Sequence, residues 1–347
     1  MGPFFIYGYP VHRPNPKESI KEKLAQLDWL GAILSVLLFT LFQIAATFSG
    51  STWTWSSGGT IAIWVIMVVL AIVLAIQQTF SIFTTEQQRI LPLTLLRSRT
   101  IALLTIGSFA TRVPMAIGIF YIPLFFEFTL SDTAIYSAVR LLPFIIILVF
   151  AMMFSGATLP RHGRYNILYI FSGICIIVAG ACMHSLIHFG TPTSHIYGFE
   201  ALLAIGAGLA QQTAYSIGVM EVVSRATGDP REDILKAVCL INLTQMASTC
   251  ISLSAAGCIY ENVGFIKLRE ALVGFGLLDS QIRSALGGAY STILAATANG
   301  GSETLRLLAL TSIVDAMNQV YLIVVVAGAV CFIAGLLMKW EKVNLTS

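Results

Sequence analysis

The chain has 347 residues, of which 56% are apolar and only 11% are charged. A soluble domain usually carries about 25% charged residues because its surface faces water, so this composition, with a mean hydropathy of +0.83, excludes an ordinary soluble protein. The net charge of +3 indicates no particular partner, and we expect no nucleic acid among the partners.

The apolar runs predict an all-α protein that crosses a membrane about eight times. Within lipid every backbone N–H and C=O must be hydrogen-bonded inside the protein, which leaves helices or a closed barrel. Because the runs are roughly 20 residues long and do not alternate, they predict helices. Residues 1–27 are hydrophilic and proline-rich, and no cleavable signal peptide is visible there. The predicted spans are 29–47, 61–80, 101–125, 134–159, 167–186, 197–223, 234–258 and 320–338.

The segment 264–316 mixes charged and apolar residues, so it is not predicted to span the membrane. We expect amphipathic helices at the outer face, joined by the tract 287–301, which is rich in Gly, Ala and Ser.

The positions of Lys and Arg predict the orientation. With a cytosolic N-terminus, 14 of the 20 Lys and Arg fall in cytosolic segments, and the three short outer loops hold none. The long outer segment 259–319 holds four, and Arg112 and Arg140 lie within spans. Cytosolic loops are normally enriched in these residues. We therefore expect both termini in the cytosol, and the protein in the plasma membrane.

Polar residues within the sixth and seventh spans form stripes. Glu200, Gln211 and Tyr215 share one face of a continuous helix, and that face either lines a substrate path or packs closely on a neighbour through Gly206 and Gly208. In the seventh span Asn242 and Gln245 share a face with Thr249 and Ser252, which either lines a cavity or joins helices.

Arginines inside the third and fourth spans are further candidates. Arg112 either faces a central cavity, where it would hold an anionic group or a carboxylate, or snorkels to the outer interface. Arg140 is expected to form a structural ion pair with Glu127 or Asp132, and the alternative is a proton relay. We name as substrate-path candidates Arg112, Glu200, Gln211, Tyr215, Asn242 and Gln245.

Enzymatic and metal chemistry find little support in the sequence. The six cysteines lie in or beside apolar runs and form no CxxC pair. The five histidines are scattered, without HExxH, and no Walker-type GxxxxGK[ST] occurs. An integral membrane enzyme would need clustered ligands at one interface. We therefore expect no enzyme, no metal and no cofactor.

Five stretches resemble the fourteen-span, drug:proton antiporter branch of the major facilitator superfamily in its fungal form. These are 24–33 (LAQLDWLGAI), 49–57 (SGSTWTWSS), 155–168 (SGATLPRHGRYNIL), 198–212 (GFEALLAIGAGLAQQ) and 316–342, which contains Met338-Lys-Trp. Their order and spacing cover nearly the whole chain. The resemblance implies that the eight spans correspond to numbers seven to fourteen of that branch, without the first six.

The resemblance also implies an organisation and a function. Residues 1–27 would be cytosolic, 28–80 the inserted helix pair, and 99–343 the C-terminal six-helix bundle, including the outer segment 264–316. Arg161, Gly163 and Arg164 look like the family's cytosolic gating loop. The expected function is secondary efflux of small organic molecules such as fungal secondary metabolites, with protons as the expected coupling ion. A proton carrier would have to be a membrane carboxyl, for which Glu200 is the candidate. The alternative is a truncated, non-transporting membrane fragment or pseudogene product.

Overall fold

The structure is a computed structural model that describes residues 28–50, 53–85, 90–92, 94–224, 230–273, 278–288 and 303–340. The expected cytosolic segment 1–27 lies outside these residues. The elements are α3 (Trp29–Phe48), α4 (Gly58–Phe80), η1 (Leu95–Arg97), α5 (Arg99–Leu130), α6 (Ala134–Arg140), α7 (Leu142–His162), α8 (Tyr165–Leu186), α9 (Thr193–Gln211), α10 (Thr213–Val223), α11 (Pro230–Ala271), α12 (Asp279–Leu286) and α14 (Glu303–Leu337).

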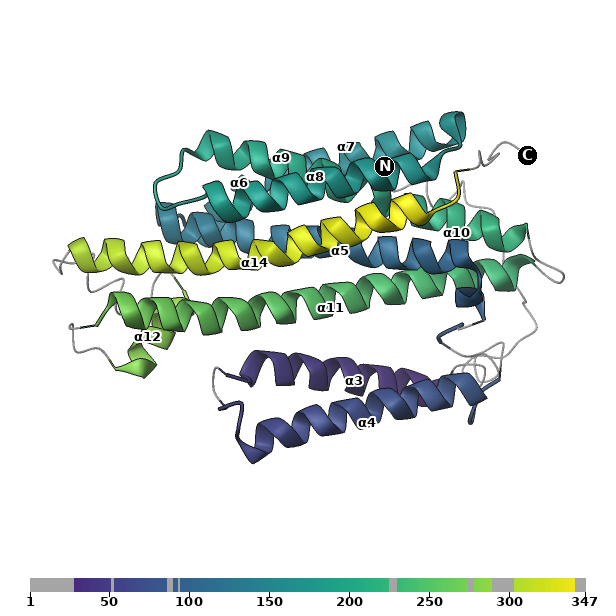
Figure 1. The fold of residues 1–347 in the computed structure, drawn as a ribbon, viewed down its shortest axis with the longest axis horizontal. Coiled ribbons are helices and arrows are strands. Elements are labelled where there is room, and N and C mark those ends of the chain that lie inside the picture. The colour runs from purple at the N-terminus through teal and green to yellow at the C-terminus, as the bar shows by residue number, and fades with distance from the viewer. Residues whose placement is uncertain are drawn as a thin grey trace, which may run out of the picture.

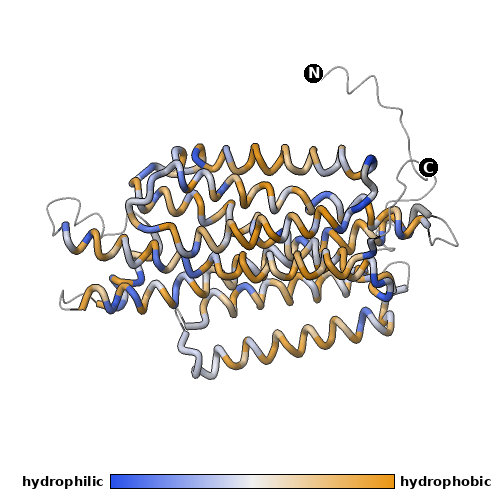
Figure 2. The backbone as a smooth tube through the Cα atoms, turned by 45° about the horizontal axis from the view of Figure 1, so that its top comes forward, coloured by the Kyte–Doolittle hydropathy of each residue, from blue (hydrophilic) through white to orange (hydrophobic). Residues whose placement is uncertain are grey.

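The chain is an all-α polytopic membrane protein, as its composition predicts. Seven helical stretches within the described residues are long and apolar enough to cross a membrane. They run nearly side by side (Figure 1), and Figure 2 shows hydrophobic colour along their middles and hydrophilic colour gathered towards their ends. Large side chains such as Val36, Val65 and Phe150 are exposed on these helices, as lipid-facing residues are.

Two of the predicted spans are interrupted. The fourth consists of α6 and α7, which meet at Leu141, two residues before Pro143 in the first turn of α7. Proline has no N–H to continue a helix across that point. The sixth predicted span, 197–223, is divided between α9 and α10 at Gln212. It is the predicted span that is absent from the seven candidate stretches of the described chain.

The two ends of the segment 264–316 differ from our expectation of separate surface helices. Residues 264–271 continue α11, and 303–316 form the beginning of α14. The apolar side chains Leu268, Leu310 and Ile313 are buried in the main core, so these segments pack against the bundle. Lys267 Nζ also meets Asp315 Oδ2 at 3.0 Å, which joins α11 to α14. Between them, α12 is a separate short helix.

Glycines allow α8 and α14 to approach closely. Gly173 and Gly180 lie seven residues apart on α8, and Gly328 and Gly335 have the same spacing on α14. A Cβ atom at Gly173 would lie 2.6 Å from the backbone nitrogen of Phe332, and one at Gly328 would lie 2.8 Å from that of Ile177. Backbone atoms cannot move aside as a flexible side chain can, so both helices require glycine here.

Gly173→Ala is therefore expected to destabilise the bundle by about 1–3 kcal/mol, the usual cost of overpacking a close-packed interior. Gly156→Ala in α7 is the matched control, because a Cβ there meets nothing within 4 Å. Thermal unfolding of the detergent-purified chain measures both variants. Equal melting temperatures for the two would contradict the close packing of α8 on α14.

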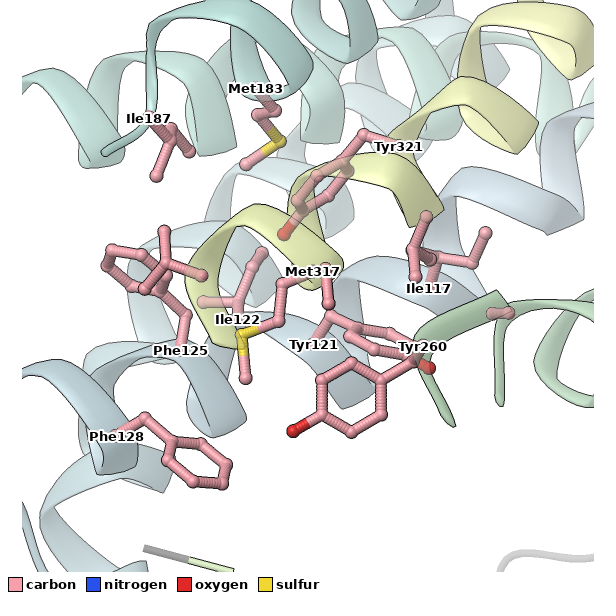
Figure 3. Packing of buried hydrophobic residues seen from close by; sticks show 14 of the residues in the cluster. Ile117, Tyr121, Ile122, Phe125, Phe128, Met183, Ile187, Tyr260, Met317 and Tyr321 are labelled. Carbon is pink, nitrogen blue, oxygen red and sulfur yellow. The ribbon is translucent and has the colours of Figure 1, made fainter. Parts of the chain in front are cut away.

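The main hydrophobic core joins α5, α8, α11 and α14. In Figure 3, Met317 and Tyr321 of α14 lie among residues of the neighbouring helices. The rings of Tyr121 on α5 and Tyr260 on α11 pack edge to face, with their centroids 6.0 Å apart. This core fixes the positions of α5 and α11, which carry most of the polar candidates.

The helices α3 and α4 form a hairpin that packs on the bundle through α3 and α11. Asp28 caps α3 by accepting a hydrogen bond from Gly31 N–H at 2.8 Å, and it also accepts one from Gln78 Nε2 at 2.7 Å. Gln78 Oε1 in turn accepts a hydrogen bond from Leu91 N–H at 2.9 Å. This buried clasp holds together the start of α3, the end of α4 and the connection to the bundle.

Candidate functional site

A polar face is formed by α5, α10 and α11 within the apolar length of the bundle. Gln245 Nε2 donates to Ser108 Oγ at 3.1 Å, which joins α11 to α5. Tyr215 OH donates to Asn242 Oδ1 at 2.6 Å, which joins α10 to α11. Polar groups are costly in lipid, so such faces turn towards protein or a water-filled path. We call Ser108, Arg112, Tyr215, Asn242, Gln245 and Thr249 the polar face.

Arg112 is the cation of this face. It lies 13 residues after the first residue of α5, about 20 Å along the helix at 1.5 Å per residue, and close to its middle. Its Nε donates to Thr249 Oγ1 at 3.1 Å and its Nη1 contacts Met115 Sδ at 3.2 Å. Arg112 is half-buried, and within the described residues no carboxylate pairs with it. The guanidinium therefore retains the capacity to bind an anion.

Two features beside Arg112 shape its surroundings. Tyr215 lies close enough to interact with the guanidinium electrostatically. Pro114 follows two residues later inside α5, and because proline has no N–H, the carbonyl of Ala110 loses its helical donor. The polar face thus lies where α5 is locally weakened.

Glu200 lies elsewhere, inside the bundle. Its side chain on α9 is 0% exposed, and among the described residues neither carboxyl oxygen has a hydrogen-bond partner. The neighbouring Leu203 and Ala204 belong to the main hydrophobic core. Tyr321 of α14 lies within electrostatic reach of the carboxyl. An unpaired carboxylate is costly to bury, whereas the neutral acid is much less so.

The predicted stripe of the sixth span is therefore divided. Gly208 packs on α7, where a Cβ would lie 2.6 Å from the carbonyl oxygen of Leu148, and Gly206 packs on α8. Gln211 is buried, and its Oε1 has no partner in the described part of the chain. The break at Gln212 begins a new helix, and Tyr215 reaches α11 from there. Arg112, Tyr215, Asn242 and Gln245 are thus brought together, while Glu200 and Gln211 lie among packed helices.

The loop candidates lie at one end of the bundle, between α7 and α8. Gly163 has a φ of 64° and ends α7 by donating its N–H to Leu159 O at 2.9 Å. This left-handed conformation favours glycine, as the tight turn predicts. Arg161 and Arg164 are exposed on either side. Near the opposite ends of these helices, Arg140 forms the expected ion pair, with Asp132, and its guanidinium lies 5.1 Å from the Phe126 ring centroid.

Sequence reasoning missed the contacts between the hairpin and the bundle. Ser254 on α11 donates to Gln43 Oε1 on α3, and no motif marks this pair. The six cysteines are free. Within the described residues, no group of three or more His, Cys, Asp or Glu residues lies close enough to hold a metal ion.

Comparisons with known proteins find fungal efflux pumps and MFS-type transporters. The chain is 30% identical over 344 residues to the efflux pump patC of Aspergillus clavatus, a match that covers 99% of this chain and 60% of the relative. It is 29% identical over 360 residues to the phomenoic acid biosynthesis cluster MFS-type transporter of Leptosphaeria maculans, covering 99% and 55%. The efflux pump alnA of Emericella nidulans is 29% identical over 350 residues, covering 99% and 60%.

The chain therefore spans about 60% of the length of the curated relatives that it matches. No family model matches it.

Proposed function

We propose that this chain, which belongs with the fungal MFS-type transporters and efflux pumps of secondary-metabolite clusters, forms one wall of a path for secondary efflux of small organic molecules. In such transporters two repeats rock around a binding site near the bilayer midplane. The chain would contribute the inserted pair 28–80 and the bundle 99–343, with 264–316 extending it on the outer side.

The observation that carries the proposal is the polar face with Arg112 at its centre. A half-buried guanidinium near the middle of a long membrane helix, bonded only to neutral groups among the described residues, is typical of a substrate or ion path. Tyr215, Asn242 and Gln245 add hydroxyl and amide groups that orient a ligand. A merely structural arginine inside a membrane would be expected to pair with a carboxylate, as Arg140 does with Asp132.

We further propose that efflux is coupled to protons and that Glu200 carries them. The carboxyl is enclosed without a partner in the described chain, so it would take up a proton when enclosed and release it when α9 opens to water. Gly163, with Arg161 and Arg164 beside it, would act as the cytosolic hinge of that movement.

The transport proposal is tested by expressing the tagged chain in yeast cells that lack their main drug efflux pumps. A panel of fluorescent, largely apolar compounds is applied, and cellular accumulation is measured against empty vector at matched membrane levels. We expect lower accumulation of at least one compound. If the chain reaches the membrane and no compound's accumulation falls, the alternative of a non-transporting fragment is favoured instead.

We also propose that the protein resides in the plasma membrane with both termini in the cytosol. The short outer loops without Lys or Arg support this orientation. Single cysteines, introduced in a cysteine-free background at Ser57 and at Arg161, are expected to react with a membrane-impermeant maleimide on intact cells only at position 57. Labelling at 161 alone would reverse the orientation.

A further inference from the structure

A pocket lies at the end of the bundle where α5 begins, away from the polar face. Its volume is about 270 Å³, and it is bounded by the connection before α5, by α10 and by α11. The lining residues are Thr94, Leu95, Arg97, Ser98, Ile101, Val222 and Asp233. One wall is apolar and the other carries hydroxyls and charges. In the proposed orientation this pocket faces the cytosolic leaflet.

Helix α5 begins beside this pocket, and no side chain caps its first turn. Ser98 is the N-cap residue, but its side chain caps no backbone N–H of the helix. Ser98 is only 9% exposed, and its Oγ has no partner in the described part of the chain. Buried polar groups are normally hydrogen-bonded, so the free hydroxyl of this pocket-lining serine is available to a ligand. Free N–H groups and the helix dipole at such a terminus favour an anion.

The charges around the pocket also favour an anionic ligand. The Arg97 side chain is exposed, and no ion pair or hydrogen bond joins it to another of the described residues. Asp233 is the one acid in the lining, and its Oδ1 lies 3.6 Å from Lys236 Nζ, which offsets its charge. Basic pockets between helices on the cytoplasmic side are where phosphorylated lipid head groups bind.

We propose that this pocket binds a phosphate group, supplied by an anionic lipid of the cytosolic leaflet. The phosphate would accept hydrogen bonds from Ser98 Oγ, from the first N–H groups of α5 and from the Arg97 guanidinium. The acyl chains would leave along the apolar wall formed by Leu95, Ile101 and Val222. Such binding is independent of transport, and it would anchor the start of α5, the helix that carries Arg112.

The test uses the full chain in nanodiscs of phosphatidylcholine, with and without phosphatidic acid. Native mass spectrometry after release into detergent counts retained phosphatidic acid, and thermal unfolding measures its stabilising effect. Arg97→Gln and Ser98→Ala are each expected to weaken retention about tenfold, as the loss of one hydrogen bond to a charged group predicts. Arg161→Gln is the control, because Arg161 is an exposed arginine outside the lining.

Asp233→Asn is expected to have the opposite effect. Removing the carboxylate beside the pocket should strengthen the retention of phosphatidic acid. Inorganic phosphate added to the detergent-purified chain distinguishes the source. If phosphatidic acid stabilises the chain and inorganic phosphate does not, the lipid is supported as the source. If inorganic phosphate stabilises the chain equally, and this effect is lost in Arg97→Gln, the pocket binds free phosphate and the lipid source is overturned. Retention that is unchanged in Arg97→Gln, or weaker in Asp233→Asn, overturns the phosphate site altogether.

Discussion

Arg112→Gln is expected to reduce the affinity for a transported organic anion roughly thirtyfold, which corresponds to about 2 kcal/mol for a lost partner of a buried charge. The guanidinium lies near the middle of α5 and is held by Thr249 and Met115, so its orientation does not depend on a bound ligand. Glutamine retains the ability to donate hydrogen bonds but removes the charge. The measurement is the concentration dependence of efflux for the compound whose accumulation the chain lowers most, at matched membrane levels.

Arg306→Gln provides the matched control for Arg112. Arg306 is also unpaired with a carboxylate in the described chain, but it lies near the start of α14 and donates to Ser131 Oγ at 3.2 Å. Its removal should leave the affinity unchanged. A substrate without negative charge should also be less sensitive to Arg112→Gln than an acid of similar size. Equal losses for acid and neutral compound would exclude direct charge recognition by Arg112.

The architecture could be predicted because lipid imposes one solution on apolar runs of this length. Trp29–Phe48, Gly58–Phe80 and Tyr165–Leu186 match the predicted spans closely. Arg140 pairs with Asp132, one of its two expected partners, which lies eight residues before it in the sequence. Gly163 ends α7 in the left-handed conformation that its tight turn requires.

The sequence did not predict where helices break or how long they continue. Assigning Glu200 and Tyr215 to one face assumed an uninterrupted helix, but the helix ends at Gln211. Periodicity treats each helix alone, so it could not tell that Gly208 faces the backbone of α7. Charged residues near 267 suggested a surface segment, although Lys267 forms an ion pair with Asp315 and the apolar residues between the charges pack inward. Tertiary contacts, which one sequence does not display, decide these points.

The pocket beside Arg97 also could not be predicted from the sequence, because tertiary contacts create it. Ser98 and Arg97 belong to a short connection whose sequence, Leu95-Leu-Arg-Ser-Arg, carries no recognisable motif. They become a site only because α10 and α11 close the other walls, through Val222 and Asp233. By contrast, the stripe on α11 was visible, since Asn242, Gln245 and Thr249 repeat at helical spacing. Its partners on α5 and α10 were not.

Glu200→Gln is expected to remove the dependence of efflux on the pH difference across the membrane while leaving the chain folded. Glutamine has the shape of the neutral acid, which is the form that can be buried without a partner at the lower cost, so the enclosed state should form as readily as before. It cannot release a proton when α9 opens, and the transport cycle would lose its driving ion. Efflux rates at matched substrate concentration, measured with and without an imposed pH gradient, give the result.

Glu261→Gln is the control that shows whether the loss of pH dependence is specific to Glu200 or follows from removing any carboxyl in the membrane. Glu261 lies on α11 beside Tyr260, is half-buried, and has Arg283 within electrostatic reach, so it has the compensating charge that Glu200 lacks among the described residues. Its replacement should leave the response to the gradient intact. If Glu200→Gln retained that response and Glu261→Gln lost it, the proton carrier would lie near the outer end of α11. Retention in both variants would instead place the coupling on another carboxyl, either the buried Asp28 or one in the part of the longer relatives that this chain does not span.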